Sequence, residues 1–267
     1  MSNVGEEEDE RVGASCGKVG DIKSEADELH DRKLFTQPDE THLGDCPLCF
    51  LPMPLKSEKS MFKTCCSETI CQGCLYAHYM SNINDRAKAL RCPFCRVPTN
   101  DDENDKRMMK RIKAGDPAPL AELGVERYHG GDYDTAFEYL TKAAELGNLM
   151  AHHQLGMMYW KGSGDVEKDE EMAVYHWEKA AIGGHPTSRH NLSVYEKKNG
   201  NVERAVKHFI IAAKLGHEES MKALWRHYSD GNITKENLDA TLRTHQAAIN
   251  AMKSAQRDAA EAVWKNK

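Results

Sequence analysis

The second half of the chain repeats a pattern of small and apolar residues. Three stretches of this kind lie 37 and then 32 residues apart, namely AAELG (143–147), AAIGG (180–184) and AAKLG (212–216). After each stretch, apolar residues recur at helical spacing, and a glycine-bearing turn leads to the next helix-like run. A repeat of this length predicts stacked helical hairpins, in which each unit buries the apolar face of the next.

The same pattern sets the bounds of the predicted array. An earlier and less regular copy begins near Leu120, so we expect the helical repeats to occupy residues 114–233. Thr234 is a candidate N-cap for a further helix, one face of which carries Leu238, Leu242, His245, Ile249 and Met252. We expect residues 234–264 to form a capping helix that covers the last apolar face of the array.

These repeats resemble the Sel-1-like repeats, which are relatives of the tetratricopeptide repeats. The pattern is A-x3-L-G-x2-Y, followed by glycines and then by A-A-x2-G. Residues 151–184 fit it best, through Ala151, Leu155, Gly156, Tyr159, Gly162, Gly164, Ala173 and Gly184. The next unit departs from it, because Ser193 stands where glycine is expected. The resemblance implies an all-α solenoid that binds an unknown partner protein.

The first half of the chain is marked by cysteines. Eight of the nine lie between residues 46 and 95, in the order C-x2-C-x15-C-C-x4-C-x2-C-x17-C-x2-C. The N-terminus is acidic and polar, unlike a secretory or transit signal, and no apolar run approaches the roughly 20 residues that cross a bilayer. We therefore expect a cytoplasmic or nuclear protein with no membrane partner, in which thiols stay reduced. Crowded cysteines in that setting favour zinc over disulfides.

The paired spacing also weighs against other kinds of thiol site. A nucleophilic cysteine needs a depressed pKa and a partnered base, and C-x-x-C pairs are a poor way to present one nucleophile. An iron–sulfur cluster would use only four of the eight thiols and is the weaker metal alternative. Eight thiolates are enough for two closed tetrahedral zinc sites, which hold structure and hydrolyse nothing.

Residues 45–99 resemble a RING-type zinc finger. Three segments carry the resemblance: CPLC (46–49), ICQGC (70–74) and CPFCR (92–96). It implies a small zinc-stabilised α+β finger with two zinc ions and interleaved ligands. By this resemblance, one ion is bound by Cys46, Cys49, Cys71 and Cys74, and the other by Cys65, Cys66, Cys92 and Cys95.

The second site departs from the usual pattern of the family. Most RING-type fingers have a histidine three residues before the fifth ligand, where this chain has Glu68. An all-cysteine variant would use the adjacent Cys65 and Cys66. His78 is the rival ligand, with Glu68 behind it, and the plain alternative for His78 is a partly buried helix histidine.

The resemblance to RING-type fingers also implies a function. Most of them bind a ubiquitin-conjugating enzyme and help it to transfer ubiquitin, and the finger itself supplies no catalytic residue. Leu48, Pro93 and Arg96 stand at positions that commonly contact the conjugating enzyme or ubiquitin. The sequence thus predicts a RING-type ubiquitin ligase whose repeats select a substrate. The alternative is a non-catalytic adaptor, in which finger and repeats both serve protein–protein interaction.

Charge separates the remaining segments. Residues 1–45 hold 13 acidic and 5 basic side chains, so we expect residues 1–44 to be a disordered acidic tail with Cys16 as a free thiol. Residues 100–113 read as a linker and connecting helix. Their basic run, KRMMKRIK (106–113), is interpreted as the charged face of that helix, in preference to a localisation signal or a nucleic-acid patch. No nucleic-acid partner is predicted.

Overall fold

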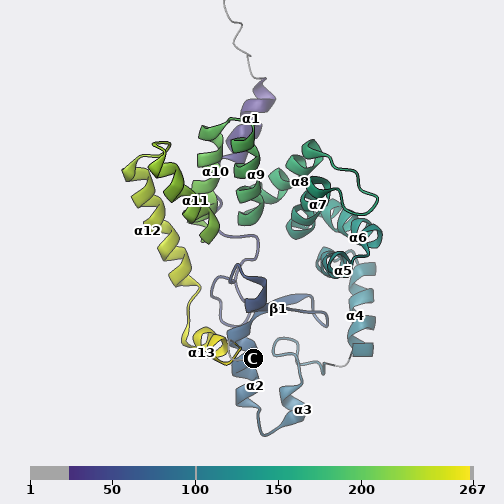
Figure 1. Ribbon diagram of the computed structural model, residues 1–267. Helices are drawn as coiled ribbons and strands as arrows, with labels where there is room; N and C mark the ends of the chain where they lie inside the picture. The colour runs from purple at the N-terminus through teal and green to yellow at the C-terminus, as the bar shows by residue number, and fades with distance from the viewer. Residues whose placement is uncertain (1–23, 100, 265–267) are drawn as a thin grey trace, which may run out of the picture.

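A computed structural model describes residues 24–99 and 101–264 of the chain. The helices of the repeats follow one another along an arc, and the cysteine-rich finger lies between the two ends of this arc (Figure 1). The first end is α4 (Asp101–Lys113), which directly follows the finger in the chain. The other end comes back to the finger through the last helix, α13 (Ala255–Trp264), which packs against α2 (Gln72–Ser81) of the finger.

The array is built from antiparallel helical hairpins. Its helices are α5 (Pro117–His129), α6 (Tyr133–Glu145), α7 (Leu149–Lys161), α8 (Glu170–Ile182), α9 (Pro186–Lys198), α10 (Val202–Lys214), α11 (Glu218–Ser229) and α12 (Lys235–Ala251). Most begin at a side chain that accepts a hydrogen bond from a backbone N–H of the first turn: Asp116, Asp132, Asn148, Asp169, His185, His217 and Thr234. Such caps satisfy N–H groups that lack a partner within the helix. They fix where each helix starts.

Small residues allow the helices of a hairpin to pack closely. A Cβ atom added to Gly156 of α7 would lie 2.5 Å from the Trp177 ring of α8, and one added to Gly124 of α5 would lie 2.6 Å from Leu140 of α6. In the next hairpin Ser193 takes the same place. It is fully buried, and its hydroxyl donates to the carbonyl oxygen of Arg189. The third unit therefore tolerates serine because the hydroxyl finds its acceptor inside its own helix.

The unequal periods of the sequence have a simple origin. Residues 130–132 and 199–201 connect two of the hairpins by short turns, whereas α7 and α8 are joined by the longer loop of residues 162–169. Asp169 N–H returns to the carbonyl oxygen of Tyr159, at 3.0 Å, so the loop begins and ends at the same side of the hairpin. The helices on either side keep their stacking.

The finger is a small α+β unit held by two loops of similar shape. Strands β1 (Ser60–Lys63) and β2 (Glu68–Cys71) pair in antiparallel fashion, followed by α2 and by the short α3 (Arg86–Ala89); a turn of 3-10 helix, η1 (Ser57–Lys59), precedes β1. Isolated bridges, Asp45 with Pro52 and Arg91 with Pro98, each close a loop that carries a C-x-x-C pair. Its core consists mostly of the cysteines, together with Met53 and Ile70. This architecture is compatible with a zinc finger.

Two expectations from sequence need correction. Disorder over residues 1–44 is wrong for residues 24–44. There α1 (Glu25–Leu34) and the extended segment after it pack on the array, because Leu34 is fully buried and Phe35 half-buried. Residues 1–23, with Cys16, lie outside the described residues.

The second correction concerns the C-terminal helix. Residues 234–264 form two helices, α12 and α13, separated at Met252–Ser254. Thr234 caps α12 as expected, and the Ser254 hydroxyl accepts from Arg257 N–H at the start of α13. The chain turns there because α13 packs on the finger and does not continue along the array. None of the described helices combines the length and the apolar character that a membrane span needs.

Candidate metal centres

The eight finger cysteines gather in two groups of four. Within each group, all four sulfur atoms lie within 4.8 Å of one another. One group consists of Cys46, Cys49, Cys71 and Cys74, and the other of Cys65, Cys66, Cys92 and Cys95. These are the two interleaved sets implied by the resemblance to RING-type fingers. Among the described residues, no other histidine, cysteine or acidic side chains form such a group.

Local structure places the first group. Cys46 and Cys49 lie on the loop closed by the Asp45–Pro52 bridge, whereas Cys71 ends β2 and Cys74 lies in the first turn of α2. The sulfurs of Cys46 and Cys74 are 3.9 Å apart, and those of Cys49 and Cys71 are 3.8 Å apart. The loop and the strand–helix junction thus meet at their sulfur atoms.

The second group joins the β1–β2 turn to the other loop. Cys65 and Cys66 occupy the turn between the strands, and Cys92 and Cys95 lie on the loop closed by the Arg91–Pro98 bridge. The sulfur–sulfur distances are 3.9 Å for Cys65–Cys66, 3.9 Å for Cys66–Cys92 and 3.5 Å for Cys65–Cys95. Two adjacent cysteines can therefore point their sulfurs into the same group.

The distances fit a tetrahedral metal site and exclude disulfides. Four sulfurs at the zinc–sulfur distance of roughly 2.3 Å form a tetrahedron with edges of about 3.8 Å. The observed sulfur–sulfur separations, from 3.5 to 3.9 Å, bracket this value. A disulfide needs about 2.05 Å between its sulfurs, and all eight thiols are free. Each group could therefore hold a metal ion, with all four positions supplied by the protein.

The pKa values of the cysteine thiols also favour metal binding. Burial, together with the nearby sulfurs of Cys92 and Cys46, raises the pKa of Cys66 and that of Cys74 to about 12. In the first group the hydrogen bond with Cys71 lowers the pKa of Cys46 to about 4, so one thiolate of that group forms at the expense of the others. Crowded thiols cannot all ionise without a cation to offset their charge. A divalent ion between them supplies that charge, so the donor set favours metal binding coupled to thiol deprotonation.

His78, the rival ligand, belongs to neither group. It lies on α2, and its Nε2 is 3.2 Å from the carbonyl oxygen of Lys88. This contact ties α2 to the end of α3. Glu68 lies in β2, paired with Lys63 of β1.

The predicted contact residues lie on the two cysteine loops. Leu48 is half-buried and packs on the cysteine core, Pro93 is half-buried, and Arg96 is exposed. Arg96 has a positive φ of 60°, as has Phe50 with 54°, and the N–H of each returns 2.8 Å to the carbonyl oxygen of the first cysteine of its loop. The two loops are therefore equivalent turns. That Leu48, Pro93 and Arg96 bind another protein stays a prediction.

The structure adds one residue that sequence patterns do not indicate. Arg257 of α13 donates to the carbonyl oxygens of Pro52 and Met252, both at 2.7 Å, and to that of Leu51 at 3.2 Å. Its other terminal nitrogen lies 3.5 Å from the sulfur of Cys49. Its partners in the finger are more than 200 residues away in the chain, so no local signal connects them.

A glycine makes this approach possible. A Cβ atom at Gly73 of α2 would lie 2.7 Å from the Arg257 Cγ and 2.8 Å from its backbone nitrogen. Helix α13 therefore rests on α2 at backbone distance, and its arginine reaches the first cysteine group. Partners of this kind around a metal site orient its ligands and compensate thiolate charge.

Comparison with known proteins identifies the helical part. The model of the Sel1 repeat family matches residues 120–148, 149–185 and 190–217. The Sel1-type helical repeats predicted from the period are thereby confirmed, and they build a helical solenoid. The matched residues begin at 120 and do not reach the cysteine groups.

Proteins similar to parts of this chain include a curated relative and a solved structure. Chitin synthase regulatory factor 4 of Schizosaccharomyces pombe is 26% identical over 158 residues, which covers 56% of this chain and 25% of that protein. The chain thus spans about a quarter of the length of this relative. The crystal structure of a Sel1 repeat protein from Oxalobacter formigenes superposes with a TM-score of 0.49 at 24% identity, covering 67% of this chain and 74% of the other.

Proposed function

We propose that this protein is an adaptor, in which the Sel1 repeats bind a partner protein and the metal-braced finger is a second interaction module. The observation that carries this proposal is the matched array of Sel1 repeats, because stacked helical repeats present extended surfaces to proteins and peptides. The relative from Schizosaccharomyces pombe is named as a regulatory factor of an enzyme, which supports a role in assembly or regulation.

We further propose that each cysteine group holds one zinc ion with a structural role. Four thiolates close the coordination sphere, so no position is left for water or substrate. Zinc would supply folding energy to a finger whose core is made mostly of its own ligands. A purified full chain is then expected to carry two zinc ions.

Binding to a defined partner tests the adaptor proposal. Partners captured by the full chain in cells are identified by mass spectrometry and purified, and each complex is then rebuilt from the two pure proteins. We expect a stoichiometric complex that survives substitution of Leu48 and Arg96 on the finger. The proposal fails if no captured protein rebinds the pure chain.

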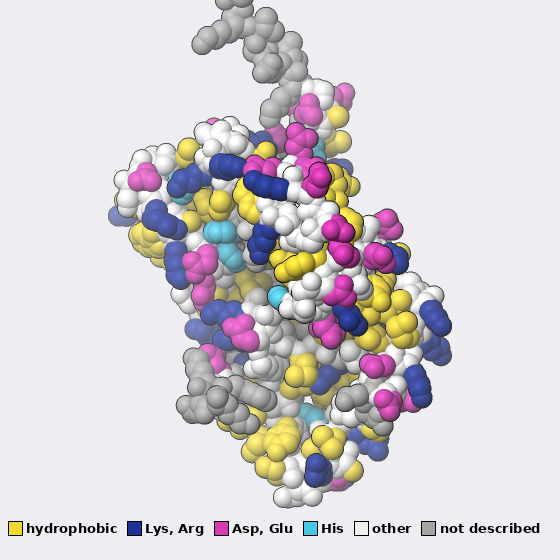
Figure 2. All heavy atoms as spheres, turned by 45° about the vertical axis from the view of Figure 1, so that its right-hand side comes forward, with side chains coloured by type: hydrophobic (Ala, Val, Ile, Leu, Met, Phe, Trp, Pro, Cys, Tyr) yellow, Lys and Arg dark blue, Asp and Glu magenta, His cyan; other side chains and the backbone are white. Residues whose placement is uncertain are grey.

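A second candidate, the RING-type ubiquitin ligase, is favoured by the finger itself. Its cysteines interleave as the resemblance implies, and Leu48, Pro93 and Arg96 stand on its two loops. Figure 2 shows apolar side chains gathered at the lower end of the molecule, where Figure 1 places α2 and α3. The exposed apolar residues of this end are Tyr79, Met80, Ile83 and Leu90. Such patches commonly mark protein-binding surfaces.

An ubiquitination assay separates the two candidates. The pure chain is incubated with ubiquitin, activating enzyme and a panel of conjugating enzymes. Ubiquitin chains that disappear in Leu48→Ala and Arg96→Ala variants with unchanged zinc content would establish the ligase. No discharge from any conjugating enzyme would leave the adaptor alone.

A further inference from the structure

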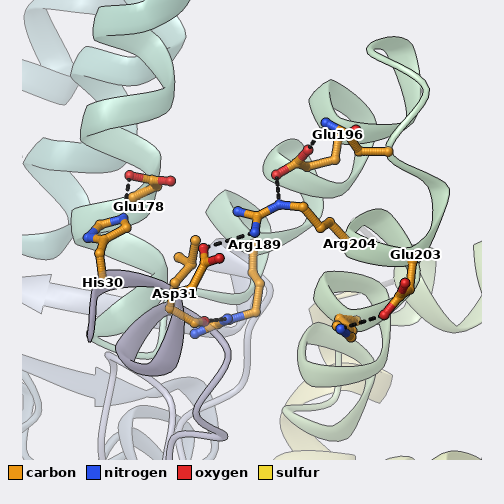
Figure 3. Close-up of polar contacts among 10 residues, drawn as sticks. His30, Asp31, Glu178, Arg189, Glu196, Glu203 and Arg204 are labelled. Atoms are coloured by element: carbon orange, nitrogen blue, oxygen red, sulfur yellow. Dashed lines mark hydrogen bonds and ion pairs between the residues drawn. The ribbon is translucent and has the colours of Figure 1, made fainter. Parts of the chain in front are cut away.

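The segment that precedes the finger lies on the array as a ligand would. Helix α1 touches three helices of the repeats, α8, α9 and α10, through its last turn (Figure 3). Beyond the helix, the extended chain continues along the array, and His42 N–H donates to the carbonyl oxygen of Gly184 at 3.1 Å. We call residues 24–42 the N-terminal strap, and the surface of α8, α9 and α10 under its helix the strap site.

Charged side chains of the strap site hold α1 in register. Arg204 of α10 donates to Asp31 of α1 at 2.8 Å, and the same guanidinium donates to Glu196 of α9 at 2.6 Å. His30 lies 3.0 Å from Glu178 of α8. Asp31 and Arg204 are both half-buried, so their ion pair is screened less than a surface pair. Arg204 therefore presents a specific contact for a carboxylate.

Two neighbouring apolar residues enter the site. Leu34 is fully buried among Ala173, Trp177, Ala181 and Leu192 of α8 and α9. The ring of Phe35 is tilted against that of His208, with 4.7 Å between the ring centroids, and the Arg204 guanidinium lies 4.8 Å from the Phe35 centroid. The site thus offers an apolar contact for an aliphatic side chain beside a contact for an aromatic ring, which the Arg204 guanidinium also touches.

A buried arginine forms a hydrogen bond to the strap backbone between these two contacts. Arg189 of α9 is fully buried, and its guanidinium donates to the carbonyl oxygens of Leu34 and of Ala181. Among the described residues, its Nε and both ring nitrogens of the fully buried His208 have no hydrogen-bond partner. Without a strap, the arginine would lose one of its two acceptors. Such a group requires a peptide carbonyl at this place.

Apart from these contacts, most side chains of α1 are exposed. Residues 24–30, 32 and 33 are exposed, and Leu29, on the same helix as Leu34, is 48% exposed. A helix of ten residues is marginal in water even with the Ser24–Asp27 capping box that begins this one. Segments with few buried contacts open at lower free energy than the core. We therefore expect the strap to open at a lower free energy than the helices of the array.

We propose that the strap site is a peptide-binding site that the chain occupies with its own segment, and that its external ligand is a short helix of the same chemistry. That ligand ends in an acidic residue, an aliphatic residue three positions later and an aromatic residue directly after it, as in Asp31, Leu34 and Phe35. The inference deepens the proposed adaptor function, on which it rests, by stating which kind of partner segment the repeats take. The partner competes with the strap, so binding is limited by the fraction of sites that are open.

The test uses the full chain and a labelled peptide of residues 24–42. In a Leu34→Ala, Phe35→Ala variant, faster amide exchange of α1 shows that the strap is released. We expect this variant to bind the peptide about tenfold or more tightly than the wild type does, because a larger fraction of its sites is open. The matched control is Leu29→Ala, which changes the same residue type on the exposed face of α1 and is expected to bind like the wild type.

Variants of the peptide test its chemistry, and a second form of the chain guards against misfolding. A Leu34→Asp peptide is expected to lose binding, whereas a Leu29→Asp peptide is expected to keep it. A protease site inserted between the exposed Thr36 and Gln37 leaves every contact of the helix in place. After cleavage at this site, the labelled peptide is expected to replace the strap helix.

Two results would overturn the inference about the strap site. A released strap, seen by amide exchange, together with no peptide binding to either form, would overturn the inference and leave the strap as a structural element. Equal binding of the Leu34→Asp and Leu29→Asp peptides would overturn it as well. The adaptor proposal would survive both results if the repeats still formed a complex with a partner through another surface.

Discussion

At the scale of single residues, the finger is distinguished by two adjacent cysteines. Cys65 and Cys66 both reach the second group, although their sulfurs leave neighbouring backbone positions. This is possible because Ser67, with a positive φ of 56°, turns the chain directly after them. The turn supplies two cysteine sulfurs where the usual pattern of RING-type fingers has one cysteine and a histidine.

Loss of this pair has a definite expected result. A Cys65→Ala, Cys66→Ala variant should bind one zinc ion per chain in place of two, because the second group loses half of its donors while the first stays intact. Metal content by mass spectrometry measures this. A His78→Ala variant is the control and should retain both ions; loss of an ion there would assign His78 to the second site.

In the array, the packing of α7 against α8 depends on the absence of a Cβ atom at Gly156. We expect Gly156→Ala to lower the free energy of unfolding by about 1–3 kcal/mol, because its Cβ would collide with the buried Trp177 ring. Denaturant unfolding measures the difference. Gly130→Ala is the matched control, since Gly130 has a helical φ and the nearest atom to an added Cβ lies 3.4 Å away. Equal losses in both variants would contradict this account.

Helical periodicity made the elements of the array predictable. The repeat of AAELG-like stretches fixes hairpins, small residues fix their close packing, and capping residues fix where the helices start. The resemblance to RING-type fingers likewise implied which sulfurs come together. The strap was not predictable, since it adds only Leu34 and Phe35 to an acidic segment whose average composition indicates disorder. The turn into α13 was missed because its partner, Gly73, is far away in sequence.

Three histidines, of which His185 is buried and His42 and His153 are half-buried, connect the strap to the array. His42 lies 4.0 Å from His185 at the start of α9, measured between ring centroids, and His185 lies 4.3 Å from His153 of α7. Burial lowers the pKa of His42 to about 4 and that of His153 to about 4, and lowers the pKa of His185 well below its usual value. All three are neutral in the folded chain at neutral pH.

Their protonation should make stability depend on pH. Unfolded histidines bind a proton near pH 6.5, so between about pH 6.5 and 4 the unfolded chain holds more protons than the folded one. The stabilisation is thus complete above about pH 6.5 and is lost as pH falls toward 4, by about 1.4 kcal/mol per pH unit for each histidine. Denaturant unfolding at several pH values is expected to give a smaller slope for His42→Gln. The exposed His129→Gln is the control, and parallel curves for wild type and His42→Gln would refute the assignment.

At the scale of the whole molecule, the finger and the C-terminal helix are one structural unit. Arg257 links α13 to the loop of the first cysteine group, and Lys59 beside β1 pairs with Glu261 of α13 at 2.8 Å. The finger also touches α11, through Lys56 and Glu218 at 3.7 Å. Metal binding by the first cysteine group would therefore be coupled to the position of the last helix.

Removal of metal should reveal this coupling. A strong chelator at neutral pH is expected to speed amide exchange in the finger and in α13, while α5–α11 keep their protection and their helical circular dichroism. Arg257→Ala is expected to free α13 with both metal ions still bound, because the loop carbonyls lose their donor at a cost of about 3 kcal/mol. Unchanged exchange of α13 in both experiments would show that its packing does not depend on Arg257 or on the metal.

The return of α13 to the finger has a mechanical consequence. Open helical arrays change curvature through small rotations between successive units. Here the finger precedes α4 in the chain and packs against α13 at the other end of the array, so the span between the ends depends on the α13–α2 junction. A binding partner that needs a flatter or tighter superhelix must first undo the α13–α2 junction, and the finger thereby restricts which shapes the repeats can offer.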